Sequence, residues 1–131
     1  MDIATARTSA TEMINSVPKV IDPATHAVLD YLTAATFFSV GLGLWTRHRR
    51  AARLALIQGT AVLGASMLTD YPGGVFKKIS FRTHGMLDVA HAAMTATMPA
   101  LMGFAGDPEA QFFHGQALIE AGVIAATDFG A

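Results

Sequence analysis

The chain of 131 residues contains no cysteine and few charged residues. Without cysteine it can form no disulfide, no thiolate metal site and no cysteine nucleophile. Charged residues make up 15% of the sequence, against about 25% in an ordinary soluble domain. Nine basic and ten acidic residues nearly balance, so the chain has no broad positive field for binding nucleic acid. The low charge favours contact with lipid instead.

The first 20 residues also have no continuous apolar stretch of the kind found in a secretory signal. Any insertion into a membrane must therefore depend on internal segments. We expect residues 1–18 to form an N-terminal segment outside the membrane. Within it, the Ser-Ala-Thr-Glu of residues 9–12 has capping-box spacing, which predicts a short surface helix. The length of the remainder, residues 19–131, suits one domain.

One phrase is written twice, as Thr-His-x-x-Leu-Asp at residues 25–30 and again at 83–88. Shifting the sequence by 58 places aligns residues 19–73 with 77–131, and 13 of the 55 aligned positions are identical. About one position in fifteen would match by chance in a chain of ordinary composition. The pattern predicts an internal duplication, in which each copy is a two-helix unit.

Start and stop signals divide each copy into two helices. Asp22 with Pro23, Ser80, and Asp107 with Pro108 each form a helix start. The Tyr-Pro-Gly-Gly of residues 71–74 ends the second helix. The predicted helices lie near 23–46, 48–70, 81–104 and 108–128.

These helices are apolar on all sides. Asp30 is the only charged residue between Ala27 and Trp45, and none lies in 54–68 or 89–105. Such helices are either buried or membrane-spanning, and little other chain is available to cover four of them. The uncharged runs of about 15 to 17 residues approach the ~20 that span a bilayer once the polar ends are included. We expect an all-α fold, a four-helix transmembrane bundle of two tandem repeats. An alanine-rich soluble bundle is the alternative.

Residues 98–127, MPALMGFAGDPEAQFFHGQALIEAGVIAAT, resemble the SPW repeat of a family of small bacterial integral membrane proteins. The shared pattern is a Ser-Pro-Trp turn, a Gly-Phe pair, a short acidic loop and an aromatic-rich helix start. Met98, Pro99 and Ala100 stand where the family has Ser, Pro and Trp, and the first copy has Ser39 and Val40 without proline. The resemblance covers residues 18–131. It implies a location in the bacterial inner membrane and assigns no biochemical role.

Six polar residues are expected to gather in one layer of an up-down-up-down bundle, because the starts of helices one and three meet the ends of helices two and four. A spacing of four places each histidine over an aspartate on the same helix face. The predicted layer, which is also the candidate metal site, consists of His26, Asp30, Asp70, His84, Asp88 and Asp128.

Three interpretations of this layer remain open. Hydrogen bonds between the histidines and either their own aspartates or the Thr-Asp phrases could clamp the helix ends together. Imidazole and carboxylate ligands could instead bind a divalent metal, as they do in other helical bundles. The layer could also receive a lipid headgroup, a quinone or a proton, and the histidines together could ligate haem.

A second candidate, His91 with Glu120, has no counterpart in the first copy, where Thr33 and Val62 occupy the equivalent positions. Both residues lie roughly 10–12 Å below the shared face at about 1.5 Å per residue. We predict that they form a buried polar pair. An ionisable residue at that depth in a membrane is costly and indicates a functional site.

No hydrolase, kinase or dehydrogenase constellation is present in the sequence. The leading hypothesis is a small polytopic membrane protein without catalytic activity of its own, an accessory subunit of a larger membrane complex. Its expected partners are the lipid bilayer and other membrane subunits. The alternative is a metal-, haem- or quinone-binding membrane protein that uses the His/Asp layer in transport or redox chemistry.

Overall fold

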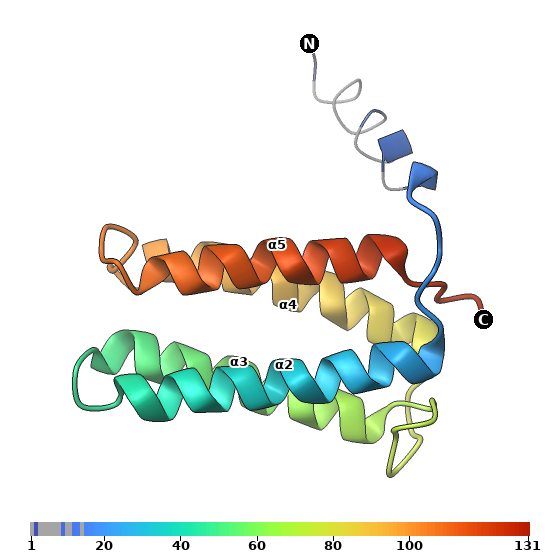
Figure 1. Cartoon of the computed structure of the whole chain (residues 1–131), viewed down its shortest axis with the longest axis horizontal. Coiled ribbons are helices and arrows are strands. Elements are labelled where there is room, and N and C mark those ends of the chain that lie inside the picture. Colours follow the sequence, from blue (N-terminus) through green and yellow to red (C-terminus); the bar gives the residue numbers. More distant parts are fainter. Residues whose placement is uncertain (1, 3–8, 10–11, 14) are drawn as a thin grey trace.

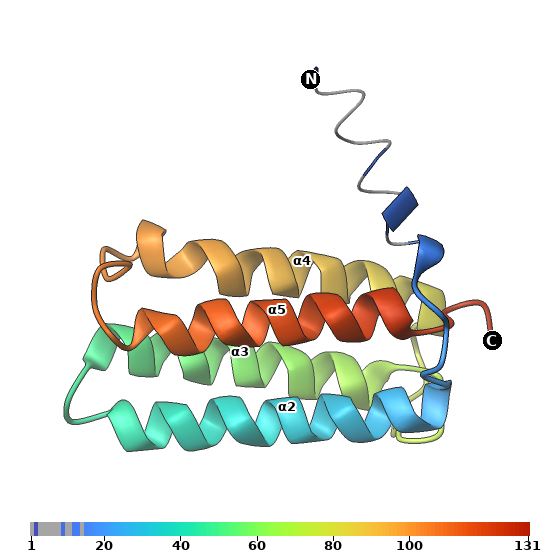
Figure 2. The ribbon, with the colours of Figure 1, turned by 45° about the horizontal axis from the view of Figure 1, so that its top comes forward.

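A computed structural model of the chain describes residues 2, 9, 12–13 and 15–131, and the fold in these residues is all-helical. Four antiparallel helices form a bundle (Figures 1 and 2). The helices are α2 (Pro23–Leu44), α3 (Arg49–Leu68), α4 (Phe81–Leu101) and α5 (Ala110–Ala126). The capping box predicted at 9–12 falls partly outside the described residues.

Two of the predicted helix starts are formed by their capping side chains. Asp22 Oδ1 accepts a hydrogen bond of 2.7 Å from the backbone N–H of Thr25, and Pro23 follows in the first turn. Hydrogen bonds from the backbone and from the side chain of Thr25 lower the pKa of the Asp22 carboxyl. Ser80 Oγ accepts in the same way from the N–H of Thr83 at 3.0 Å. The starts of α2 and α4 are therefore capped in the same way, by a side-chain oxygen that accepts from the N–H three residues later.

The predicted start of the last helix is wrong by two residues. Helix α5 begins at Ala110, and Glu109 precedes it without a side-chain cap. Asp107, the expected cap, instead has Oδ2 at 2.8 Å from His48 Nε2. His48 in turn caps α3, because its Nδ1 accepts from the N–H of Ala51 at 3.1 Å. Asp107 is thus used to join the two hairpin loops. The four helices also end two or three residues earlier than predicted.

The bundle is assembled from two hairpins, α2–α3 and α4–α5, which also meet along α3 and α4. Both hairpin loops lie at one end of the bundle, and the α3–α4 connection, the start of α2 and the C-terminus lie at the other (Figure 1). Phe37, Leu54, Phe104 and Phe113 form the core nearer the hairpin loops.

The flanks of the helices expose large apolar side chains and almost no charge. Within the four helices the only acidic residues are Asp30, Asp88 and Glu120, whose side chains are at most 20% exposed. The helix arginines lie within the first five residues of α3 and in the first turn of α4. The exposed apolar residues of the helices include Val28, Leu32, Leu42, Ile57, Met86, Val89, Met94, Leu101, Leu118 and Ile119.

Among the described helices, α2 and α3 are long and apolar enough to cross a membrane, with mean hydropathies of 1.5 and 1.4. Helix α5, with 17 residues, is shorter than the sequence had suggested. Core helices of soluble bundles meet the same standard of length and composition. The sequence predicts four spanning helices, and two of them, α2 and α3, have the required length and apolarity.

Candidate metal centre

The candidate site lies at the end of the bundle where two isolated backbone pairings hold the helix starts against the helix ends. Ile21 pairs with Thr127, and Thr69 pairs with Ile79, in two isolated parallel bridges. The Ile21 N–H donates to Ala126 O at 2.9 Å, and the Asp70 N–H donates to Ile79 O at 2.8 Å. A shift of 58 residues converts each bridge into the other. The starts of α2 and α4 are thereby fixed against the ends of α5 and α3.

Each bridge brings a threonine hydroxyl to a buried histidine. His26 Nδ1 lies 2.9 Å from Thr127 Oγ1, and His84 Nδ1 lies 2.7 Å from Thr69 Oγ1. Both hydroxyls already donate their only proton to a backbone carbonyl four residues earlier. Their oxygens can therefore only accept from the rings. Each Nδ1 therefore carries a proton that it donates to a threonine. Each Nε2, on the opposite side of the ring, remains available to bind another group.

Both Nε2 atoms face the same two carboxylates. His26 Nε2 is 3.0 Å from Asp88 Oδ2 and 3.3 Å from Asp30 Oδ1. His84 Nε2 is 2.9 Å from Asp30 Oδ2 and 3.2 Å from Asp88 Oδ1. We call these four residues the His/Asp cluster. One ligand atom from each can be chosen so that all four lie within 4.8 Å of one another.

The contacts in the His/Asp cluster need a positive charge between the nitrogen and oxygen atoms. An imidazole lone pair and a carboxylate repel each other unless a proton or a cation lies between them. His84 Nε2 is buried and, although near Asp30, has no partner with hydrogen-bond geometry among the described residues. Both histidines are only 1% exposed. The donor set of two imidazoles and two carboxylates suits a divalent transition metal.

Tyr71 supports one side of the His/Asp cluster. Its hydroxyl donates to Asp30 Oδ2 at 2.8 Å. Burial of the ring, together with the charge of Asp30, raises the pKa of the Tyr71 phenol, which keeps it a proton donor. The residue 58 positions later is Phe129, which has no hydroxyl to offer Asp88. The two carboxylates are therefore held differently.

Aromatic rings cover the histidines on the outer side. The His26 ring lies 5.3 Å from both Phe81 and Phe129, and those two rings are 4.9 Å apart. Phe129 can pack this closely because residue 85 is glycine, where a Cβ would lie 2.9 Å from the Phe129 ring. These rings exclude water and strengthen electrostatic interactions within the cluster.

The prediction that Asp70 and Asp128 belong to this layer is wrong. The Asp70 side chain is 67% exposed and lies 3.8 Å from Lys77 Nζ. Asp128 is exposed, and its Oδ1 accepts from the N–H of Gly130 at 3.0 Å. The chain leaves the helices at the preceding threonines, so Thr69 and Thr127 reach the histidines while the aspartates face water.

The structure brings His91 and Glu120 together in the interior. His91 Nδ1 lies 2.7 Å from Glu120 Oε1, and both side chains are 11% exposed. His91 Nε2 is 3.1 Å from the backbone oxygen of Gln58, which can only accept, so this nitrogen carries a proton. Gln58 also donates to Thr95 Oγ1 at 2.7 Å. Glu120 Oε2 is buried and has no hydrogen-bond partner in the described part of the chain.

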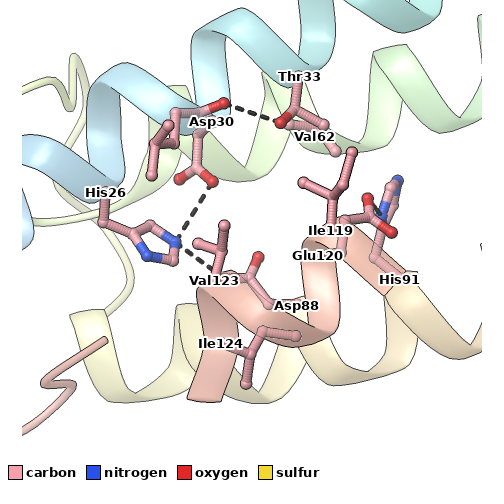
Figure 3. A pocket seen from close by; sticks show the side chains of 11 residues that line it. His26, Asp30, Thr33, Val62, Asp88, His91, Ile119, Glu120, Val123 and Ile124 are labelled. Atoms are coloured by element: carbon pink, nitrogen blue, oxygen red, sulfur yellow. Dashed lines mark hydrogen bonds and ion pairs between the residues drawn. The ribbon is translucent and has the colours of Figure 1, made fainter. Parts of the chain in front are cut away.

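A cavity of about 30 Å³ connects the two groups (Figure 3). His26, Asp30 and Asp88 line one end, and His91 with Glu120 lines the other. Aliphatic side chains, including Val123 and Ile119, form the remaining walls. A wider apolar groove of about 250 Å³ between α3 and α4 also reaches Asp88 and His91.

Sequence reasoning named all four residues of the His/Asp cluster but missed its support. The sequence predicts that Tyr71 lies in the turn that ends the second helix and assigns it no part in the layer, although it directly follows the Thr-Asp phrase of residues 69–70. His48 stands among arginines in the sequence, which predicts a solvated loop residue. In the structure it instead caps α3 and contacts Asp107. No sequence signal identified Gln58 as the partner of His91.

Together, the fold and the cluster define a class, namely an all-helical bundle with a buried site of two histidines and two carboxylates. No protein-family model matches the chain, and neither a curated protein nor a solved structure matches it. The resemblance to the SPW-repeat family therefore stays a prediction.

Proposed function

We propose that this protein is a four-helix membrane protein that binds one divalent transition-metal ion at the His/Asp cluster. The observation that carries the proposal is the convergence of two buried Nε2 atoms on two carboxylates, with both Nδ1 protons already committed to threonines. The threonines thus hold each ring in the tautomer with the proton on Nδ1, which leaves Nε2 to bind a metal. In metalloproteins, residues that contact a ligand histidine fix its tautomer in the same way.

The chemistry of the donor set narrows the class of metal. Magnesium and calcium prefer oxygen ligands alone, whereas imidazole suits zinc, iron, nickel and copper. Two carboxylates also balance the charge of a divalent cation when the histidines are neutral. The donor set therefore favours a divalent transition metal.

The membrane location is supported by the distribution of charge along the bundle. The exposed charges lie at its two ends, and the flanks between them are apolar. Helix α2, with 22 residues, is about 33 Å long at 1.5 Å per residue, enough for a hydrocarbon core of ~30 Å. A tandem duplication would account for the pseudo-two-fold pairing of contacts, as parallel repeats do in larger membrane proteins.

The test is to measure zinc binding by the detergent-extracted, metal-stripped protein and by its Asp88→Asn variant. Asparagine keeps the size of the side chain but removes the charged ligand. We expect one zinc per wild-type chain and at least a tenfold weaker affinity in Asp88→Asn. Asp70→Asn, which alters an exposed carboxylate outside the cluster, serves as the matched control and keeps wild-type affinity. Equal affinity in all three proteins would contradict the proposal.

A second candidate function, that of an accessory subunit in a membrane complex, is favoured by the outer face of α5. Gly115 and Gly122 are exposed, seven residues apart, and a Cβ at either position would meet no atom within 4 Å. Small residues on one helix face allow another membrane helix to approach closely. Native mass spectrometry of gently extracted membranes tests this role. Attached polypeptides would support it, and a single chain would contradict it.

A further inference from the structure

The cavity between the His/Asp cluster and the His91–Glu120 pair gives the cluster one side that no protein atom fills. Its volume of about 30 Å³ exceeds the ~10–15 Å³ that one water molecule requires. Three of the four cluster residues line it, so a ligand in the cavity would lie beside the side chains that would hold the ion. On the opposite side of the cluster, the rings of Phe81 and Phe129 pack against the His26 ring.

Glu120 supplies the polar group that such a ligand needs at the far end of the cavity. Only Oε1 is engaged by His91, and Oε2 is buried without a hydrogen-bond partner among the described residues. A buried carboxylate oxygen left in this state is costly unless a donor reaches it. Thr33 also lines the cavity and can accept a further hydrogen bond, since its hydroxyl proton is donated to Leu29 O.

The asymmetry between the two halves explains why the space exists. His91 and Glu120 of the second half correspond to Thr33 and Val62 of the first, and all four line the same cavity. The larger pair fills its side of the bundle axis, whereas the smaller pair leaves room. The cavity therefore arises because Thr33 and Val62 have smaller side chains than His91 and Glu120.

We propose that the metal site is open toward this cavity and binds one water-sized ligand, which bridges the ion and the Glu120 carboxylate. The inference rests on the proposed metal-binding function. It makes the ion a Lewis acid with an exchangeable position rather than a closed structural site. The ligand class is water, or a small molecule of similar size that donates a hydrogen bond to Glu120.

The experiment uses the full-length protein loaded with Mn²⁺, a paramagnetic probe, and counts exchangeable water ligands by pulsed electron paramagnetic resonance in deuterated water. Val123→Ile adds one methyl group to a wall of the cavity, and Thr33→Ile fills it from α2. Val28→Ile is the matched control, because Val28 is 59% exposed on the outside of α2.

We expect a deuterium signal from one bound water in the wild type and in Val28→Ile, and loss of that signal in Val123→Ile and Thr33→Ile while Mn²⁺ stays bound. A wild-type protein that binds Mn²⁺ without an exchangeable water would overturn the open position and leave the metal site standing. Retention of the signal in both filled variants would also overturn it. Failure to bind Mn²⁺ or any other divalent transition metal would overturn both proposals.

Discussion

His26 and Asp88 are 62 residues apart in the chain, yet His26 Nε2 lies 3.0 Å from Asp88 Oδ2. In the counterpart pair the histidine belongs to the second half of the chain and the aspartate to the first. His84 Nε2 lies 2.9 Å from Asp30 Oδ2. Each half of the chain therefore supplies the imidazole of one contact and the carboxylate of the other. Neither half contains a complete site, so the four ligands come together only when the two hairpins pack.

Removing a threonine acceptor should weaken metal binding without changing a ligand. Thr127→Val preserves the shape of the side chain but leaves the His26 Nδ1–H buried without a partner. Loss of such an outer-shell contact typically lowers metal affinity by about 10–100-fold. We expect that decrease in zinc titrations of Thr127→Val and equally of Thr69→Val.

Thr97→Val is the control for these variants, since Thr97 donates to a carbonyl four residues earlier on an exposed part of α4. It should bind zinc as the wild type does. If all three valine variants bound zinc equally well, the threonines would have no part in orienting the rings.

The hydroxyl of Tyr71 should contribute to one carboxylate only. Tyr71→Phe removes the donor to Asp30 Oδ2 and recreates the situation at Phe129, so we expect a decrease of about tenfold in zinc affinity. Tyr31→Phe, which instead loses a hydrogen bond to the backbone oxygen of Gly73, should leave zinc affinity unchanged. Identical losses in the two variants would mean that Tyr71 acts through general stability.

Metal binding should weaken as the pH falls. Each Nε2 must be free of a proton to bind the ion, so protons and metal compete for the two ring nitrogens. Because the competing protons bind more as the pH is lowered, the dissociation constant for zinc should rise between pH 7.5 and pH 5.5. Isothermal titration at several pH values measures this dependence. A dissociation constant that does not change with pH would place the metal elsewhere.

The membrane location makes a separate prediction. If the apolar flanks of the helices contact lipid, the protein should remain in the membrane pellet after alkaline carbonate washing and enter solution only with detergent. Substituting Leu118, which is 76% exposed on α5, by lysine should reduce the fraction inserted, since a charge in the lipid region costs roughly 2.5–3.5 kcal/mol. Extraction of the wild type in plain buffer would identify the soluble bundle instead.

The sequence predicts the helices and the four cluster residues because their signals are local or repeated. Asp22 and Ser80 are capping residues by type, and the His-x-x-x-Asp spacing places each pair on one helix face. The positions of Asp70 and Asp128 were not predictable, since the last helical turn decides whether the threonine or the aspartate faces inward. The displaced start of α5 depends on the contact between Asp107 and His48, which join across 59 residues of chain.

The cavity is the feature least accessible from sequence. It depends on the difference in side-chain volume between Thr33 with Val62 and His91 with Glu120, and on how closely four helices approach at that level. The sequence indicated that His91 and Glu120 could meet. It gave no signal that the space beside them would extend to Asp30 and Asp88.

The most direct test of the central claim is X-ray absorption spectroscopy of the zinc-loaded protein. The account predicts two imidazole nitrogens among the ligands at about 2.0–2.1 Å, with oxygen ligands completing the shell. It also predicts that His84→Gln removes one of the two imidazole contributions. A zinc spectrum without imidazole scattering, or one unchanged by His84→Gln, would contradict the claim that the His/Asp cluster is a metal site.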